Sequence, residues 1–253
     1  MPYAHPDVLV STDWVAQNLR TPGVKIVEVD VDPKQYHAGH IPGAIGWDWN
    51  KDLQDPVRRD IPSPEAMSTL LSRSGIAPGE TIVLYGDSSN WFAAYGFWVL
   101  KVYGHKDVRL MNGGRAKWLN EPDRVMTPER PAVAPTNYTI DGSRIDRSLR
   151  AFLPEGLAIA QKRDHKLVHV RSNDEFTGKV IAPPGMTETA QRAGHVPGAK
   201  SVPWASAVNQ DGTFKSIDEL KGIYLHSAGV DASKPTVDYC RIGERSSHTW
   251  FVL

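Results

Sequence analysis

The chain has 253 residues, of which 40% are hydrophobic and 23% charged, and its 29 basic and 29 acidic residues give a formal net charge of zero. This length and composition predict one large or two small globular domains. The balanced charge excludes recruitment of nucleic acid or an anionic membrane by net charge alone. The single cysteine excludes an intrachain disulfide and is typical of a reducing compartment.

Targeting and membrane segments are not expected. The first residues lack the basic start and the apolar stretch of a signal peptide. The most apolar run, residues 91–100, is far shorter than the ~20 residues that span a bilayer. We therefore expect a cytoplasmic protein that does not insert into a membrane.

The first half of the sequence recurs in the second half. VKIVEVD (24–30) and HKLVHVR (165–171) are short β-branched runs, which are typical of buried parallel strands. GHIPGA at 39–44 recurs as GHVPGA at 194–199. Other identical residues keep this spacing to within one position: Trp49 and Trp204, Glu65 and Glu219, Gly75 and Gly229, Val83 and Val237, Tyr85 and Tyr239. This agreement predicts a duplicated domain.

In each copy, short apolar strands alternate with helical stretches. The stretches 63–75 and 216–229 begin at a serine that can cap a helix and end at a glycine. Such alternation predicts an α/β fold, with a mostly parallel sheet covered by helices on both faces. Four prolines in 121–139 indicate a linker. We predict a first domain over 1–125, a linker over 126–143 and a second domain over 144–253.

The only cysteine, Cys240, lies between a strand-like run and a helix-like run. In parallel sheets, ligands bind at this carboxyl end of the strands. A loop that closes on a helix N-terminus gathers backbone N–H groups and the positive end of the helix dipole. We therefore expect a lowered pKa and a thiolate at Cys240, with positive charge from Arg241 and Arg245 and a hydrogen bond from Ser246. The arginines argue against a buried structural cysteine.

Taken together, these features resemble the tandem rhodanese family and, within it, the bacterial thiosulfate sulfurtransferases. The resemblance covers essentially the whole chain. It is carried by DVLVSTDW, LYGD, MNGGRAKW, GHVPGAKSVPW, DGTFKS and CRIGERSSHTWFVL. It implies that the Cys240 thiolate takes the outer sulfur of thiosulfate, releases sulfite and holds a persulfide. Cyanide or a thiol, such as glutathione or a thioredoxin-like protein, then removes that sulfur. The resemblance implies no metal and no organic cofactor.

The resemblance also implies an active-site loop and neighbouring cations. The loop comprises Cys240, Arg241, Ile242, Gly243, Glu244, Arg245 and Ser246. Arg171 ends the first strand of the second copy and is a candidate for substrate binding. An insertion over 176–191 is expected to be a loop because of its Pro-Pro-Gly. Lys179 near its start and Arg192 directly after it are further candidates.

Three other functions remain open. Arg241 resembles the thiosulfate-using type, because mercaptopyruvate sulfurtransferases tend to have glycine there. Ile242 and Glu244 depart from the loop of the animal enzymes, so a mercaptopyruvate donor is an alternative. A non-catalytic module that carries a persulfide for a partner is another. A cysteine phosphatase or arsenate reductase is disfavoured, since the loop is C-x4-R and theirs is C-x5-R.

The two copies differ at the loop and at the end. In the first copy the cysteine falls on Gly86 or Asp87, so we expect that domain to be inactive and to wall the site, with Trp91 and Phe92 as candidates. After residue 100 the first copy continues through a strand-like VRLMN, whereas the second copy stops at WFVL. We expect the second domain to lack its last strand, and this form to fold poorly or to assemble through the open sheet.

Overall fold

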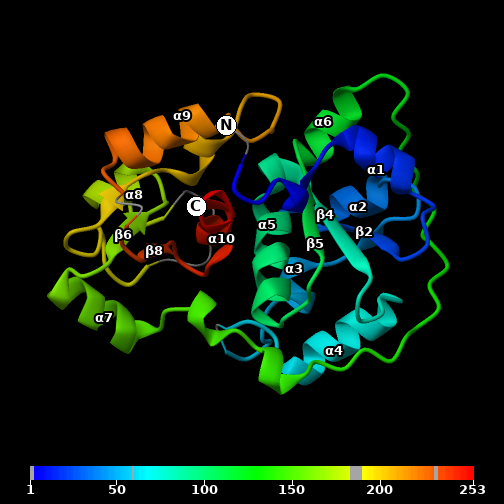
Figure 1. Cartoon of the computed structure of the whole chain (residues 1–253), viewed down its shortest axis with the longest axis horizontal. Helices are drawn as coiled ribbons and strands as arrows, with labels where there is room; N and C mark the ends of the chain where they lie inside the picture. The colour runs from blue at the N-terminus through cyan, green and yellow to red at the C-terminus, as the bar shows by residue number, and fades with distance from the viewer. Residues whose placement is uncertain (1–2, 59, 183–189, 231–232) are drawn as a thin grey trace. The chain divides into compact units, whose positions relative to one another are not determined.

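A computed structural model of the chain describes residues 3–58, 60–182, 190–230 and 233–253. The chain divides into two compact units, whose elements are labelled in Figure 1. The N-terminal unit comprises Pro2–Arg147 and Val208–Phe214, and the C-terminal unit comprises Ser148–Ala207 and Lys215–Leu253. The boundary therefore falls between Arg147 and Ser148, and the segment expected to be a linker, 126–143, lies within the N-terminal unit.

The core of the N-terminal unit is a parallel sheet of five strands in the order β1-β5-β4-β2-β3. The strands are β1 (Leu9–Val10), β2 (Val24–Glu28), β3 (Ile45–Gly46), β4 (Thr81–Tyr85) and β5 (Val108–Met111). Ile82, Val83 and Leu84 of β4 are fully buried, as expected for a strand covered on both faces. The covering helices are α1 (Thr12–Asn18), α2 (Lys34–Ala38), α3 (Trp49–Asp52), α4 (Pro64–Arg73), α5 (Asp87–Val102) and α6 (Gly114–Asn120). Shorter 3-10 turns are η1 (Pro6–Val8), η2 (Gly142–Arg144) and η3 (Arg147–Leu149).

The segment 126–143 runs along the N-terminal unit through backbone contacts. Thr127 and His40 exchange backbone hydrogen bonds of 2.8 and 2.9 Å. Farther along, the N–H of Tyr138 donates to Ser72 Oγ at 2.9 Å. These contacts attach the proline-rich segment to the N-terminal unit.

The C-terminal unit has a smaller parallel sheet in the order β7-β6-β8. Its strands are β6 (Lys166–His169), β7 (Lys200–Ser201) and β8 (Thr236–Tyr239). Sequence spacing matches them to β2, β3 and β4 of the N-terminal unit. In the N-terminal unit β5 also pairs with β4, but in the described part of the C-terminal unit no strand pairs with the far edge of β8. Within the described residues β8 is thus an edge strand, and all four of its residues are only half-buried.

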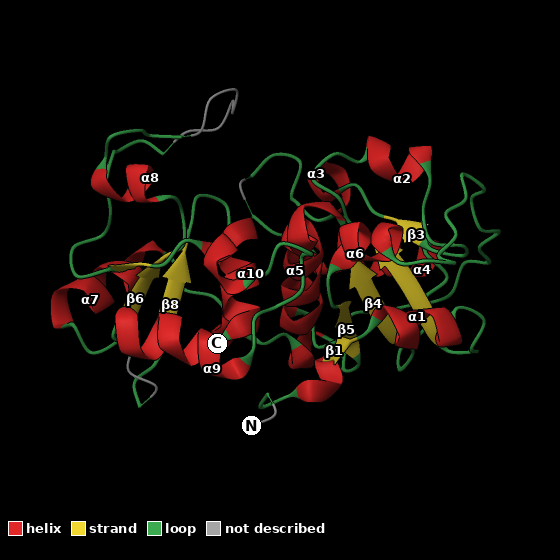
Figure 2. Ribbon diagram, turned by 90° about the horizontal axis from the view of Figure 1, so that it is seen from above, coloured by secondary structure: helices red, strands yellow, loops and turns green. Residues whose placement is uncertain are grey.

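Helices flank the C-terminal sheet, with α10 beside β8 in Figure 2. They are α7 (Leu153–Lys162), α8 (Asn173–Thr177), η4 (Trp204–Ala207), α9 (Ile217–Lys221), the π-helical η5 (Gly222–Ser227) and α10 (Glu244–Val252). The predicted caps are confirmed, because Ser63 Oγ accepts from Ala66 N and Ser216 Oγ accepts from Glu219 N. Among the described helices, none combines the length and apolar character that crossing a membrane demands.

The duplicated GH-x-PGA segments make the same contacts in both units. His40 Nδ1 lies 2.9 Å from the Tyr36 carbonyl oxygen, and His195 Nδ1 lies 2.8 Å from the Phe176 carbonyl oxygen. Each imidazole also stacks on the ring of that same residue. Both histidines thus make the structural hydrogen bond that their repetition in the sequence predicts.

Candidate active site

Cys240 lies directly after the carboxyl end of β8, in the loop that leads to α10, and Figure 2 shows these two elements side by side. Tyr239, the last residue of β8, is anchored by its hydroxyl, which accepts a hydrogen bond of 2.8 Å from Val196 N. A parallel sheet presents its loops at this edge. The strand and the helix therefore fix both ends of the loop that holds the thiol.

Three groups surround the sulfur atom. Cys240 Sγ donates to Glu244 Oε2 at 3.1 Å, and the backbone N–H of Gly243 donates to Sγ at 3.2 Å. Ser246 Oγ lies 3.7 Å from Sγ. Gly243 has φ of 108°, a left-handed conformation that favours glycine, and this turn directs its N–H toward the sulfur. The sulfur therefore has a carboxylate on one side and hydrogen-bond donors on the other.

The pKa of the Cys240 thiol is raised, whereas the sequence predicts that it is lowered. Burial is the main cause, and the negative charge of Glu244 raises the pKa further. Arg245 lowers it, but does not reverse the shift. The composition of the loop alone predicts a thiolate. In the structure, burial and the carboxylate of Glu244 raise the pKa of the thiol by more than Arg245 and the Ser246 backbone lower it. The expected preformed thiolate is therefore wrong for the resting loop.

Arg245 points its charge toward a glutamate. Its Nη1 and Nη2 lie 3.0 and 3.4 Å from the carboxylate oxygens of Glu175, which is fully buried. Burial alone would raise the pKa of Glu175, but the hydrogen bonds from Arg245 and Ser172 hold it below its ordinary value. Much of the positive charge that the sequence assigns to Arg245 is thus offset inside the unit.

Arg171 is brought to the same glutamate. It is 4% exposed, its Nη1 lies 3.5 Å from Glu175 Oε1, and its Nη2 donates to the Gly194 carbonyl oxygen at 2.8 Å. Its Nε donates to His169 Nε2 at 2.8 Å. Burial, followed by the charge of Arg171, lowers the pKa of His169 to about 4, so this imidazole is neutral at pH 7. Arg171 therefore links β6 to α8 and to the GH-x-PGA segment.

The other two candidate cations lie at the surface. Lys179 pairs with Asp174 at 3.5 Å, and 73% of its side chain is exposed. Arg192 is also exposed. The predicted Pro-Pro-Gly loop between them falls at 183–185, outside the described residues. The contacts of the described residues bring neither cation to Cys240.

Sequence reasoning missed Glu175, the residue that joins Arg171 to Arg245. A signal for it was available: Ser172 and Glu175 form the S-x-x-E pattern of a capping box, and the structure has both hydrogen bonds of that motif at the start of α8. The pattern places Glu175 on the first turn after β6, at the edge of the sheet where Cys240 lies. Within the described residues, no group of three or more histidine, cysteine, aspartate and glutamate side chains could hold a metal ion.

Comparison with known proteins gives three consistent findings. The model of the Rhodanese-like domain family matches residues 11–121 and 155–253. A protein of Saccharopolyspora erythraea named "Putative thiosulfate sulfurtransferase" is 55% identical over 250 residues, which cover 98% of this chain and 86% of that protein. The "Sulfur carrier protein TtuD" of Thermus thermophilus is 51% identical over 257 residues, which cover 100% of this chain and 89% of that protein.

A likeness in three dimensions supports the fold. The crystal structure of SseA from Escherichia coli, described as a 3-mercaptopyruvate sulfotransferase with the "Rhodanese" fold, superposes with a TM-score of 0.82. The match covers 97% of this chain and 94% of that chain, at 22% sequence identity. At this identity the likeness concerns the fold alone.

Proposed function

The chain belongs to the family of Rhodanese-like domain proteins, and on that basis we propose that it is a thiosulfate sulfurtransferase that carries the transferred sulfur on Cys240. The observation that carries this proposal is the position of the thiol: Sγ lies at the carboxyl end of β8, within hydrogen-bond distance of both Gly243 N–H and the Glu244 carboxylate. The donor follows from the name of the relative that is 55% identical.

In the first step the Cys240 thiol passes its proton to Glu244 as Sγ attacks the outer sulfur of thiosulfate. The new bond joins Sγ to that sulfur, and the sulfur–sulfur bond of thiosulfate breaks. Sulfite leaves with the electron pair of the broken bond, and a persulfide remains on Cys240. The raised pKa of the thiol makes a nearby proton acceptor necessary, and the 3.1 Å hydrogen bond supplies one.

In the second step an acceptor removes the outer sulfur. Cyanide or a thiolate attacks the outer sulfur of the persulfide and takes it, and the electron pair of the cleaved bond returns to Sγ. The Gly243 N–H and the Ser246 hydroxyl are placed to stabilise the sulfur anion that reappears. We propose a cytoplasmic thiol as the natural acceptor, such as glutathione or a thioredoxin-like protein, because a single cysteine suits a reducing compartment.

The charges near the loop favour an anionic donor. Arg171, Arg241 and Arg245 contribute three positive charges, and Glu175 and Glu244 contribute two negative ones. The excess of one positive charge attracts thiosulfate. Because Arg171 and Arg245 are engaged by Glu175, we assign contact with the donor to the backbone N–H groups of the loop, of which that of Gly243 already donates to Sγ.

Sulfur carriage without rapid turnover is the second candidate. The 51% identity to the protein named sulfur carrier favours it. The buried, protonated thiol also suits a persulfide that waits for a partner protein. A carrier and an enzyme would differ in how fast a small acceptor removes the bound sulfur.

Intact mass spectrometry tests these proposals. The full chain is incubated with thiosulfate and then with cyanide, and the variant Cys240→Ser is treated in parallel. We expect a gain of one sulfur atom in the wild-type chain alone, followed by its loss with formation of thiocyanate. A gain that cyanide leaves in place favours the carrier. A gain from mercaptopyruvate but not from thiosulfate overturns the donor, and a gain in Cys240→Ser overturns the site.

A further inference from the structure

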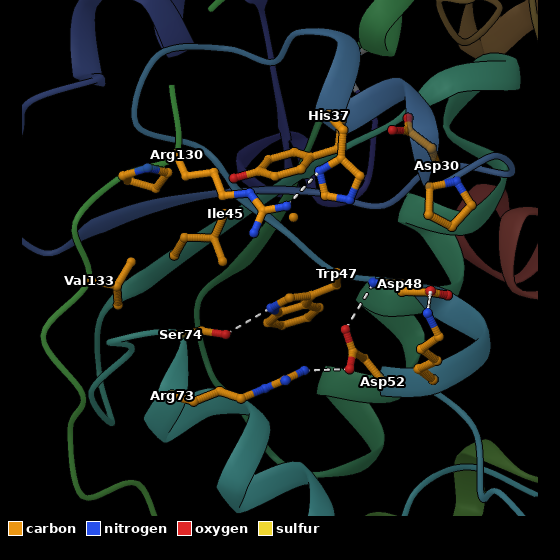
Figure 3. Close-up of a pocket in the computed structure, with 15 residues that line it drawn as sticks. Asp30, His37, Ile45, Trp47, Asp48, Asp52, Arg73, Ser74, Arg130 and Val133 are labelled. Carbon is orange, nitrogen blue, oxygen red and sulfur yellow. Dashed lines mark hydrogen bonds and ion pairs between the residues drawn. The ribbon is translucent and has the colours of Figure 1, made fainter. Parts of the chain in front are cut away.

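A pocket of about 500 Å³ opens in the N-terminal unit, and the described residues that line it all belong to that unit (Figure 3). It lies at the carboxyl ends of β2 and β3, between the end of α4 and the segment over 130–133. This is the edge of the sheet at which parallel α/β folds bind ligands. The thiol loop of the C-terminal unit contributes nothing to its lining.

The inner wall of this pocket is apolar and held in place. Figure 3 shows Trp47 between the Arg130 side and the Arg73 side, with Ile45 and Val133 beside it. Trp47 is 3% exposed, and its Nε1 donates to Ser74 Oγ at 2.9 Å. The buried indole therefore forms the fixed base of this wall, and the half-buried Ile45 and Val133 offer surface to an apolar ligand group.

Two cations of the lining are neutralised by carboxylates. Arg73 forms an ion pair with Asp52. Lys51 Nζ lies 3.0 Å from Asp48 Oδ2. These pairs cancel in charge and form the polar side of the pocket opposite Arg130 in Figure 3.

Arg130, the third cation of the lining, contacts a histidine where Lys51 and Arg73 contact carboxylates. The Nη2 of Arg130 donates to His37 Nδ1 at 3.2 Å. Because a guanidinium can only donate, the Nδ1 atom of His37 carries no hydrogen and accepts this bond. Among the lining residues that the structure describes, none has a carboxylate that pairs with Arg130 within 4.0 Å. Arg130 therefore brings a positive charge to the pocket that its neighbours do not offset.

The remaining acidic residue of the lining does not change this balance. Asp30 is 1% exposed and its Oδ2 is buried without a hydrogen-bond partner among the described residues. Burial, followed by the nearby charge of Glu28, raises the pKa of Asp30 to about 9, so it is neutral at pH 7. The lining then carries one net positive charge, located on Arg130.

We propose that this pocket binds a small organic monoanion, with its carboxylate on Arg130 and its apolar body against the wall formed by Ile45, Trp47 and Val133. A guanidinium binds a planar carboxylate through two parallel hydrogen bonds. The volume lies within the range of roughly 300–1,000 Å³ found for small-molecule sites. The single net charge matches a monoanion, and the apolar wall distinguishes an organic acid from an inorganic ion.

Binding of phenylacetate to the full chain tests this proposal. The chain is labelled with ¹⁵N at tryptophan, and the indole N–H signal of Trp47 is assigned with Trp47→Phe. We expect phenylacetate to shift that signal in a saturable way. We expect binding to weaken roughly tenfold or more in Arg130→Gln, because a charged hydrogen bond is lost. Arg20→Gln removes the same charge at an exposed position of the same unit and should bind like the wild type.

Two further ligands and one variant complete the test. Inorganic sulfate and benzyl alcohol, which lack respectively the apolar body and the charge, should bind more weakly than phenylacetate. Cys240→Ser should bind phenylacetate unchanged, and Arg130→Gln should retain sulfur transfer, because neither pocket nor loop contains the other's residues. Equal affinity of wild type and Arg130→Gln, absence of binding, or sulfate binding as tight as phenylacetate would each overturn the proposal.

Discussion

The two units differ at the turn that follows β4 in the N-terminal unit and β8 in the C-terminal unit: the first has a glycine there and the second a cysteine. Tyr85 and Tyr239 each accept a hydrogen bond, at 2.9 and 2.8 Å, from the backbone N–H of the residue that follows the Gly-His pair. The residues after these tyrosines, Gly86 and Cys240, therefore occupy matching positions. Of the two residues that the sequence offered as counterparts of the cysteine, Gly86 is the one that these contacts favour.

In each loop, the side chain four positions after the turn residue accepts a hydrogen bond from that residue, but the donor atoms differ. In the N-terminal unit Asn90 accepts from the backbone N–H of Gly86 at 3.0 Å and donates to the Met111 carbonyl oxygen at 2.7 Å. In the C-terminal unit the residue at the same offset, Glu244, accepts from the thiol of Cys240. One loop is closed by an amide, and the other offers a carboxylate to a reactive atom. The fourth residue after the turn therefore distinguishes a loop that is fixed by an amide from a loop that has a proton acceptor beside a thiol.

Both units also bury an ion pair close to the turn, and breaking the pair in the C-terminal unit gives the largest expected loss of stability. The pairs are Glu28–Arg115 and Glu175–Arg245. Glu175→Gln removes the carboxylate that the buried guanidinium groups of Arg171 and Arg245 share, and leaves Arg245 with only Glu244 at 3.6 Å. We therefore expect the C-terminal unit to lose about 3–5 kcal/mol of unfolding free energy. Hydrogen exchange of the β6 and β8 amides in the full chain measures this loss.

A double variant shows whether the loss comes from an unpaired charge. Glu175→Gln combined with Arg245→Met removes the carboxylate and one of the two guanidinium groups that share it, and leaves Arg171. We expect the double variant to be less destabilised than Glu175→Gln alone, because one buried charge fewer lacks its partner. Glu219→Gln, at an exposed position of α9, serves as the control for the glutamate-to-glutamine change. If the double variant unfolds at least as readily as the single one, the pair is not what holds Glu175 and Arg245 in place.

Replacing the carboxylate beside the thiol by an amide tests what the carboxylate of Glu244 contributes to the C-terminal loop. Glu244→Gln gives the C-terminal loop a side-chain amide, as Asn90 gives the N-terminal loop. The negative charge of Glu244 raises the pKa of Cys240, so its loss should move thiolate formation to lower pH. Without the proton acceptor, kcat/KM for thiosulfate near pH 7 should nevertheless fall about 10²-fold.

Two measurements separate this role from simple repulsion of the anionic donor. The rate of alkylation of Cys240 by iodoacetamide against pH reports thiolate formation, and steady-state kinetics report turnover. If Glu244 only repelled thiosulfate, Glu244→Gln would turn over faster than the wild type. The proton-acceptor role requires easier alkylation together with slower turnover, and Glu219→Gln should change neither.

The close contact at Gly86 shows why the N-terminal loop holds no side chain at the position of the cysteine. A Cβ atom at Gly86 would lie 2.1 Å from the Val29 carbonyl oxygen, which belongs to the backbone and cannot move aside cheaply. Gly86→Ala should therefore destabilise the N-terminal unit by roughly 1–3 kcal/mol. Gly142→Ala, where a Cβ atom would meet nothing within 4 Å, is the matched control. Chemical denaturation of both variants decides, and equal stability would contradict this explanation.

The sequence predicts what depends on local pattern. The β-branched run at 24–30 contains β2, and the serines at 63 and 216 cap helices where expected, because strand alternation and capping depend on residues within a few positions. The place of Cys240 between strand and helix follows from the same patterns. The ion pair inside the C-terminal unit could not be predicted in this way, because it depends on a contact between distant segments: Arg245 and its partner Glu175 are 70 residues apart. The direction of the thiol pKa depended on burial, which loop composition does not reveal.

A last difference between the units lies inside the two sheets and predicts a dependence of stability on pH. Asp238 on β8 stands where the fully buried Leu84 stands on β4. Its Oδ2 is buried without a hydrogen-bond partner among the described residues, and burial raises the pKa of Asp238 from 3.8 to about 7. The folded state then binds a proton that the unfolded state releases near pH 4. The Asp238 carboxyl should therefore make the C-terminal unit lose stability as pH rises from about 4 to about 7, by roughly 1 kcal/mol per pH unit in the middle of that range. His169, whose pKa is lowered to about 4, contributes in the opposite direction over much of that range, so the effect of Asp238 is read as a difference between the wild type and a variant without this carboxyl.

Asp238→Asn tests this assignment, because asparagine does not titrate. Hydrogen exchange of the β6 and β8 amides across the same pH range, corrected for the intrinsic exchange rate, should show that the stability of the wild type falls relative to that of the variant as pH rises from about 4 to about 7. Asp218→Asn, at an exposed position of α9, should follow the wild type at every pH. The same pH dependence in the wild type and in Asp238→Asn would assign the titration to another group. A fall that is specific to Asp238 would mean that the carboxyl in place of a leucine makes this sheet relatively weaker at neutral pH than in mild acid.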